Sequence, residues 1–113
     1  MIARVWRGWT TREMADAYER LLRGEIFPGI LAKQLQGFLR IELFRRELQD
    51  ETEFKTVMWF ASQGAVTACV AEDHGAAYVP ASARQVLARF DERAMHYEVR
   101  EGRDALASPT PSP

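Results

Sequence analysis

The amino-acid sequence predicts an α+β fold of the ferredoxin-like type, with a four-stranded antiparallel sheet that carries helices on one face. Two observations support this prediction. Three segments alternate with the period of two that a pleated strand imposes and a fourth is a short run that is apolar on both faces, and the segments between them carry apolar residues at helical spacing. The order along the chain is strand, helix, strand, strand, broken helix, strand. Short connections and right-handed crossovers then give the βαββαβ arrangement.

The first strand is predicted from Ile2 to Trp9. Its side chains alternate, so that one face carries Ile2, Arg4 and Trp6 and the other carries Ala3, Val5, Arg7 and Trp9. Arg7 is the member that packing explains least, because a guanidinium that points inward requires an anion or a carboxylate partner.

The first helix is predicted from about Thr11 to Arg23. Thr10 and Glu13 form a capping-box pattern, and one helical stripe then holds Met14, Ala15, Tyr18, Leu21 and Leu22. Gly24 indicates the C-terminal end of this helix, and the pair Pro28-Gly29 indicates a further interruption. The segment from Ile30 to Gln36 has two open interpretations, one more helical turn or an irregular connection.

The stretch from Phe38 to Phe60 is predicted to form a long β-hairpin. In its first strand Leu39, Ile41 and Leu43 alternate with Phe38, Arg40, Glu42 and Phe44. The polar segment from Gln49 to Thr52 is the predicted turn. The second strand, Phe54 to Phe60, is apolar on both faces, with Phe54, Met58 and Phe60 on one and Val57 and Trp59 on the other. Such a strand requires cover above and below.

A broken helical region and a last strand complete the domain. Ser62 is a predicted N-cap, followed by an apolar stripe of Ala65, Val66, Cys69 and Val70 that ends at Asp73-His74-Gly75. Helix resumes near Pro80, after Tyr78 and Val79, with Ala83, Val86, Leu87 and Phe90 pointing inward. The last strand runs from Ala94 to Arg100. We expect one domain over residues 1–101 and a flexible tail rich in proline and serine over residues 102–113.

The composition restricts the function classes. The chain has 113 residues, a net charge of -1 and a single cysteine, so neither a disulfide within the chain nor a global positive field for nucleic acid is expected. No cluster of cysteine and histidine has metal-ligand spacing. The N-terminus has no signal-peptide pattern, and no stretch is long and apolar enough to span a membrane. A cytoplasmic protein without nucleic-acid or membrane partners is expected.

The second face of the predicted sheet is the main open question. All four strands carry large apolar residues on both faces, whereas two helices can cover only one face. The uncovered face would be a larger apolar patch than monomers usually expose. The sequence therefore predicts a homodimer that pairs through its sheets.

Five pieces of the sequence together resemble the antibiotic biosynthesis monooxygenase family of small dimeric α+β barrel proteins. They are Met1 to Gly8, the strand that ends in Trp59, Ala71-Glu72-Asp73, Tyr78-Val79-Pro80 and His96-Tyr97-Glu98-Val99. The resemblance implies a barrel made from two sheets, a pocket in each subunit between sheet and helices, and oxidation of aromatic polyketides by dioxygen without flavin, haem or metal. Relatives that degrade haem use an asparagine on the first strand, and the polyketide oxygenases also place one in the pocket. This chain contains no asparagine, so haem degradation is not expected and the catalytic set of the oxygenases does not carry over intact.

Five residues are candidates for the site. His74 and Tyr78 are the predicted catalytic residues, and Arg7, Trp59 and His96 the predicted substrate-binding ones, because the first, third and last strands converge with the broken helix in this topology. Each also has a structural interpretation. His74 can end a helix, Tyr78 and the tryptophan can fill the core, and His96 can be a satisfied strand histidine.

Three functions are compatible with these sequence features. The first is a cofactor-free monooxygenase acting on a small aromatic or polyketide-like substrate, and no cofactor is predicted. The second is a non-catalytic ligand-binding or structural dimer, consistent with the absence of an activated nucleophile pair. The third is an RNA-binding module of the same βαββαβ layout, which the strand Glu53 to Phe60 disfavours because it lacks the basic-glycine-aromatic signature.

Overall fold

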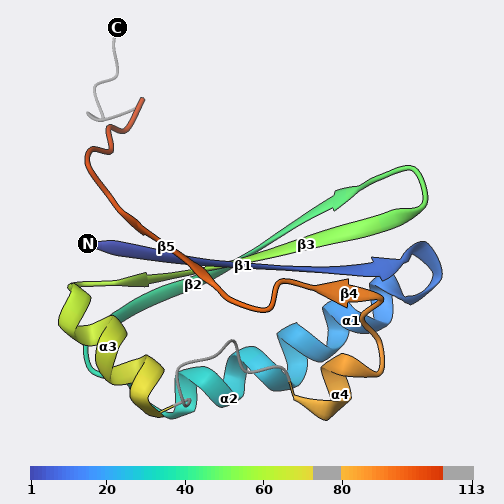
Figure 1. The fold of residues 1–113 in the computed structure, drawn as a ribbon, viewed down its shortest axis with the longest axis horizontal. Helices are drawn as coiled ribbons and strands as arrows, with labels where there is room; N and C mark the ends of the chain where they lie inside the picture. Colours follow the sequence, from blue (N-terminus) through green and yellow to red (C-terminus); the bar gives the residue numbers. More distant parts are fainter. Residues whose placement is uncertain (73–79, 106–113) are drawn as a thin grey trace, which may run out of the picture.

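A computed structural model describes residues 1–72 and 80–105, with the side chains of residues 70–72 not described. Its centre is an antiparallel sheet in the order β2-β3-β1, with β4 and β5 both pairing with the other edge of β1 (Figure 1). The strands are β1 (Ile2–Thr11), β2 (Phe38–Glu47), β3 (Glu51–Phe60), β4 (Arg89–Phe90) and β5 (Met95–Glu98). The predicted α+β, ferredoxin-like fold is confirmed.

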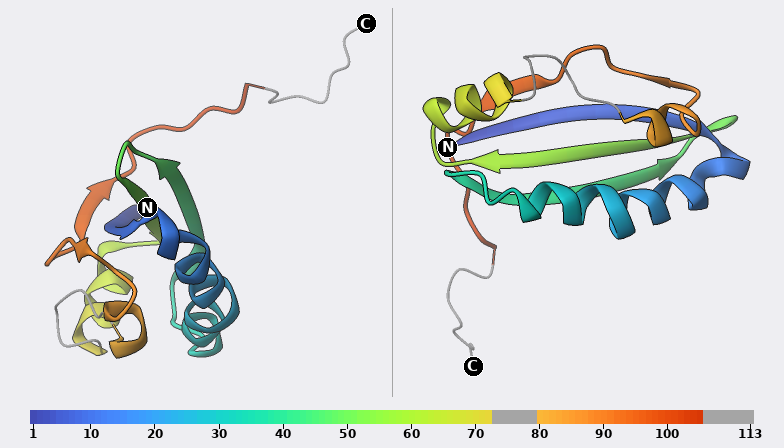
Figure 2. Two further views of the ribbon diagram at one scale, coloured as in Figure 1. Left: turned by 90° about the vertical axis from the view of Figure 1, so that its right-hand side faces the viewer. Right: turned by 90° about the horizontal axis from the view of Figure 1, so that it is seen from below.

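The helices cover one face of this sheet (Figure 1). Figure 2 shows them in two rows beneath the sheet, one row formed by the helix after β1 and the other by α3 (Gln63–Glu72) and α4 (Ala81–Arg84). Two buried clusters join the layers. One holds Ala15, Tyr18, Leu22, Phe54, Ala83 and Leu87, and the other holds Ile2, Phe60, Val66 and Cys69.

The helix after β1 is longer than the sequence indicates. A short 3₁₀ turn, η1 (Arg12–Met14), leads into α1 (Ala15–Leu21), a π-helical segment (Leu22–Ile26) and α2 (Phe27–Ala32). The predicted stop at Gly24 is wrong because a glycine ends a helix by adopting positive φ, and Gly37 is the glycine with positive φ among the described residues. Pro28, in the first turn of α2, has no backbone N–H to donate to a carbonyl oxygen of the preceding turn, and the wider π turn before it relieves the crowding that its ring would cause.

The first strand begins at Ile2 as predicted but ends at Thr11, two residues after the predicted Trp9. Thr10 does not cap the helix, because it continues β1 opposite Thr52 and is fully buried. The cap is Thr11, whose Oγ1 accepts a hydrogen bond from the backbone N–H of Met14 at 3.3 Å. The predicted turn is also shorter than expected. β3 begins at Glu51, and the backbone N–H of Leu48 donates to the carbonyl of Glu51 at 2.8 Å.

A β-bulge at the start of β2 changes which way Phe38 points. Phe38 lies opposite Phe60 while Arg40 lies opposite Trp59, so three residues of β2 oppose two of β3. The predicted strict alternation, which places Phe38 on the side of Arg40, is therefore wrong. Phe38 packs instead on the helix side, with its ring centroid 5.5 Å from that of Phe60.

Gly37 allows β2 to begin close to α3. Its φ is +81°, and a Cβ built there would lie 2.5 Å from the Cβ of Ala65. A larger residue would be strained in its backbone and would push against the helix. The predicted cap of α3 is confirmed at the same place, because Ser62 Oγ accepts from the backbone N–H of Ala65 at 3.2 Å.

The last part of the domain agrees with the predicted pattern in part. Pro80 precedes α4, in which Ala83 is buried, and Leu87 is buried after it. Phe90 lies on β4 and not on a helix, so the last edge of the sheet is two short strands in succession where one was predicted. The predicted helix end at residues 73–75 and most of the predicted tail, residues 106–113, lie outside the described residues. None of the helices within the described ranges has the length and apolar character that crossing a bilayer requires.

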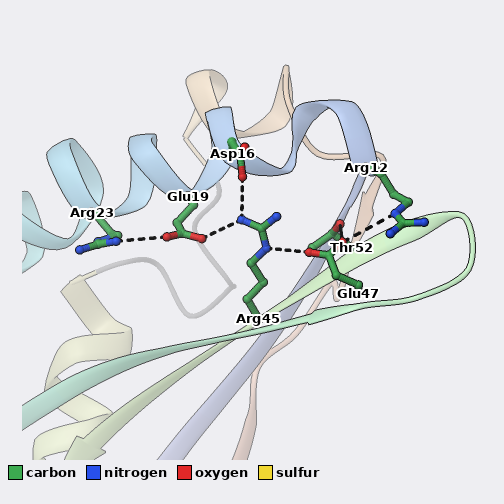
Figure 3. Close-up of polar contacts among 7 residues, drawn as sticks. All are labelled: Arg12, Asp16, Glu19, Arg23, Arg45, Glu47 and Thr52. Atoms are coloured by element: carbon green, nitrogen blue, oxygen red, sulfur yellow. Dashed lines mark hydrogen bonds and ion pairs between the residues drawn. The ribbon is translucent and has the colours of Figure 1, made fainter.

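A cluster of ion pairs joins the long helix, which is the continuous helical segment over residues 12–32, to the β2–β3 hairpin (Figure 3). The guanidinium of Arg45 lies 2.9 Å from a carboxylate oxygen of each of Asp16, Glu19 and Glu47. Thr52 donates to the other oxygen of Glu47 at 2.7 Å. The hydrogen bonds from Arg45 hold the pKa of Glu19 below its ordinary value, and those from Thr52 and Arg45 do the same for Glu47.

We expect Arg45→Met to lower the free energy of unfolding at pH 7 by about 1 kcal/mol, because the pairs are only partly shielded from water. A depressed carboxylate pKa contributes stability that is present above the unfolded value of 4.5 and lost as pH falls through the folded value. Urea unfolding at several pH values should therefore show a flatter acid limb in the variant.

The matched control is Arg40→Met, on the same strand but with a more exposed side chain that pairs with Glu42. Its stability should change by a few tenths of a kcal/mol at most, as is usual for exposed pairs, and its acid limb should keep the wild-type slope. An Arg45→Met protein with the wild-type slope between about pH 5 and pH 3 would contradict the assigned role of the cluster.

Candidate functional site

A cavity of about 420 Å³ lies between the sheet and the two rows of helices. The even-numbered residues of β1 and β3 face the helices, so the floor of the cavity contains Arg4 and Trp6 from β1 and Thr56 and Met58 from β3. The remaining lining residues are Tyr18, Leu22, Glu25, Ile26, Phe27, Gly29, Ile30, Lys33, Leu35, Cys69, Pro80 and Ala83. The lining is mainly apolar and aromatic, as is usual for small-molecule sites.

The long helix forms the largest wall. Its π-helical segment contributes Leu22, Glu25 and Ile26 to the lining, and α2 continues the wall with Phe27 and Ile30. A π turn places one more residue in a helical turn, so it shifts the lining face of everything that follows. Because no motif marks this shift in the sequence, this wall could not be predicted from apolar spacing alone.

Tyr18 is a buried phenol in the lining. Its side chain is 1% exposed, and its ring packs edge-to-face on Phe54 with centroids 4.9 Å apart. Its hydroxyl makes no hydrogen bond within the part of the chain that the structure describes. Burial raises the pKa of Tyr18 well above its ordinary value, so the group stays protonated at pH 7 and can donate to a ligand.

Arg4 brings a positive charge to the floor of the cavity. It lies opposite His96 of β5, and its Nη1 is 3.2 Å from Nε2 of His96. Burial and then the charge of Arg4 lower the pKa of His96 from its ordinary value, so at pH 7 the imidazole is neutral and Nε2 accepts the hydrogen bond. Within the described residues Arg4 makes no ion pair with a carboxylate.

Arg7 lies on the opposite face of the sheet. Its Nε is 2.9 Å from Oδ2 of Asp91 and its Nη2 is 3.2 Å from Oδ1, and its guanidinium also lies 5.2 Å from the ring centre of Trp9. The carboxylate partner expected for Arg7 is thus Asp91, which lies in the connection between β4 and β5. Hydrogen bonds to both oxygens raise the pKa of Arg7, so the charge is fixed.

Trp59 also faces away from the cavity. It lies opposite Ala3 of β1, and its indole N–H donates to Oε1 of Glu42 at 2.6 Å. The expectation that Arg7 and Trp59 line one cavity with the helices is wrong, because odd-numbered positions of β1 and β3 point to the other face. A role for these two residues in ligand binding stays a prediction.

Of the three other predicted site residues, one is described by the structure and two are not. His96 lies on the cavity side of the sheet, where it contacts Arg4, and it is exposed to solvent. His74 and Tyr78 lie outside the described residues, so their predicted catalytic roles stay predictions. The sequence pattern places Arg4 and Trp6 on one face of the first strand and Tyr18 on the apolar stripe of the first helix, but these residues were not among the predicted site residues. The signal available was a charged residue at an inward strand position.

We expect Arg4→Gln to raise the pKa of His96, because the positive charge and hydrogen bond that favour the neutral imidazole are removed. The midpoint should stay below 6.5, since burial, the larger cause, remains. A proton NMR titration measures this, with the two histidines of the chain told apart by His74→Gln. Arg40→Gln, at the far edge of the sheet, is the control that should leave the midpoint unchanged. A His96 midpoint that is the same in wild type and Arg4→Gln would contradict the pairing.

Comparison with known proteins gives a likeness in structure alone. No family model matches the chain, and no curated protein matches its sequence. Among solved structures, a putative antibiotic biosynthesis monooxygenase from Bacillus cereus superposes with a TM-score of 0.68 at 14% identity, covering 92% of this chain and 97% of that one. A putative antibiotic biosynthesis monooxygenase from Deinococcus radiodurans gives a TM-score of 0.62 at 15% identity, covering 94% of this chain and 99% of that one. The chain therefore has the fold of these two monooxygenase-like proteins over nearly its whole length.

Proposed function

We propose that this chain is a cofactor-independent monooxygenase that oxidises a small aromatic or polyketide-like substrate with dioxygen. The observation that carries the proposal is the apolar cavity of about 420 Å³ between sheet and helices. The two similar structures from Bacillus cereus and Deinococcus radiodurans are named putative antibiotic biosynthesis monooxygenases, which supports the reaction class.

The walls suit a planar aromatic molecule. Trp6, Tyr18 and Phe27 line the cavity together with aliphatic side chains from the long helix. Aromatic side chains bind flat rings by offset and edge-to-face contacts, and a volume of this size lies within the range typical of small-molecule sites.

The polar groups suit a substrate that becomes an enolate. In an anthrone, a methylene group between two aromatic rings loses a proton, and the negative charge moves to the carbonyl oxygen. The guanidinium of Arg4 or the phenol of Tyr18, which lie at different places in the lining, would stabilise that oxygen as a hydrogen-bond donor. The methylene compound and one O₂ give the ketone and one water. The substrate supplies all four electrons, so the balance requires no external reductant.

Proton removal requires a base. The neutral imidazole of His96, beside Arg4 on the cavity side of the sheet, is one candidate. His74 and Tyr78 remain the catalytic residues predicted from the sequence, and the variants His74→Gln and Tyr78→Phe address them directly. A base is identified by a loss of turnover with substrate binding retained.

We expect oxygen uptake with an electron-rich anthrone to stop under nitrogen and to be unaffected by chelators, because dioxygen is the only oxidant in the proposal. An oxygen electrode with product analysis measures this. Ile30→Trp, which fills the cavity, should lower the catalysed rate at least about tenfold. Leu31→Trp, the neighbouring residue with 53% exposure, is the control for surface effects and for spontaneous oxidation. Product formation that persists without oxygen, or that is equal in the two variants, would reject the oxygenase.

A non-catalytic ligand-binding dimer is the second candidate. The observation that favours it is the absence of asparagine from the sequence, since the family that the chain resembles places an asparagine in its pocket. In that case aromatic molecules would bind in the cavity and oxygen uptake would equal the spontaneous rate.

We also propose a homodimer joined through the uncovered face of the sheet. That face carries Phe44 at 48% exposure and Tyr97 at 52%, with the partly buried Val5, Trp59 and Met95 between them. A two-fold axis would bring the same patch of two copies together and remove these side chains from water.

We expect the wild-type protein to sediment at micromolar concentration as a particle of twice the 12.9 kDa chain mass. Tyr97→Glu places a charge in the proposed interface and should shift the protein toward the single chain. Leu31→Glu, with 53% exposure on α2, is matched in exposure and should leave the mass unchanged. A wild-type particle of one chain mass would exclude the dimer.

A further inference from the structure

We infer that the ligand of the cavity is an elongated apolar acid, with its carboxylate or acidic phenol oxygen at Arg4 and a second polar group at the hydroxyl of Tyr18. The inference rests on the proposed function in using the same cavity, and it names the chemical class that the cavity selects. It does not depend on whether a reaction follows binding.

Arg4 supplies the positive charge with which an acid would pair. The guanidinium is permanently charged, is partly buried beside an apolar cavity, and has His96 as its partner among the described residues. A neutral imidazole occupies one of five N–H donors and leaves the positive charge without a counter-charge. A carboxylate in the cavity would accept two parallel hydrogen bonds from the remaining donors, the strongest geometry that this side chain offers.

The hydroxyl of Tyr18 supplies a second polar contact in the lining. A phenol that is 1% exposed normally finds a hydrogen-bond partner, and this one has none in the described part of the chain. Because the hydroxyl stays protonated, it donates, and a hydroxyl, carbonyl or ether oxygen of a ligand would accept.

The strand positions beside which these two groups lie are well separated along β1. The ring of Tyr18 packs on Phe54, which lies opposite Gly8, and Arg4 lies four residues earlier on the same strand. At about 3.3 Å per residue these strand positions are about 13 Å apart. Between them the floor is formed by Trp6, Thr56 and Met58, which offer mainly apolar surface. A ligand that uses both ends is therefore long, apolar in its middle and polar at its ends.

Two other charged residues in the lining, Glu25 and Lys33, fit this assignment. Both are exposed, and they lie on the long helix or directly after it. Water screens the repulsion between Glu25 and a bound anion, whereas the attraction by the partly buried Arg4 is screened less.

The test uses 2-naphthoic acid and its neutral isostere 2-naphthamide. Binding is followed by calorimetry and by quenching of tryptophan fluorescence, since Trp6 lines the cavity. We expect the acid to bind about tenfold more tightly to the wild-type protein, the advantage that a charge-assisted pair gives. Arg4→Gln should remove the preference, Arg4→Lys should keep most of it, and Arg40→Gln, at the far edge of the sheet, should leave it unchanged. Thermal unfolding of each variant shows that it is folded.

The other end of the cavity is tested with 6-hydroxy-2-naphthoic acid. Its added hydroxyl should improve binding by about threefold to tenfold over 2-naphthoic acid in the wild type, and the gain should vanish in Tyr18→Phe. Equal binding of acid and amide by the wild type, or an acid preference that survives Arg4→Gln, would overturn the inference. Acid-selective binding without oxygen uptake would reject the oxygenase and leave the inference standing. Oxygen-dependent turnover of a neutral anthrone without acid preference would support the oxygenase and overturn the inference.

Discussion

The structure depends on the pleat of β1, the strand that lies between β3 and the last edge of the sheet. Each neighbour fixes its register residue by residue, so alternate side chains are committed to opposite faces. Arg4 and Trp6 thereby face the helices and the cavity, while Arg7 faces away and is held by Asp91. A slip of one residue would exchange these roles, so the ion pair of Arg7 also helps to keep Arg4 in the cavity.

Much of the fold could be predicted because it follows from short-range periodicity. The alternation in β1 and β3, and the cap at Ser62, are local patterns with few alternatives. Two wrong predictions about the fold, the helix end at Gly24 and the side to which Phe38 points, concern features that depend on contacts between residues distant in sequence. Gly24 resembles a helix end, but the apolar stripe on either side of it keeps the helix packed on the sheet, so tertiary packing overrides the local signal. The bulge at Phe38 likewise follows from its packing against Phe60.

The candidate site was less predictable than the fold. The sequence shows that Arg7 needs an anion, but it does not show whether the anion is a ligand or Asp91, which is distant along the chain. The cavity itself is space that side chains leave unfilled, and it depends on how the long helix lies over Trp6 and Met58. Arg4 could have been selected from one clue, because a charged residue on the inward face of a strand requires an explanation.

The π-helical segment has a consequence for how such a cavity can change over generations. A π turn is equivalent to one residue inserted into an α-helix, and each residue of an α-helix turns by about 100°. Loss of one residue between Leu22 and Ile26 would restore a regular helix and rotate the side chains that follow, so that Phe27, Ile30 and Lys33 would leave the cavity together. A single-codon deletion would therefore remodel a whole wall at once, while the sheet with Arg4 and Trp6 stayed as it is. Specificity in this fold can thus change in one discrete step as well as by gradual substitution.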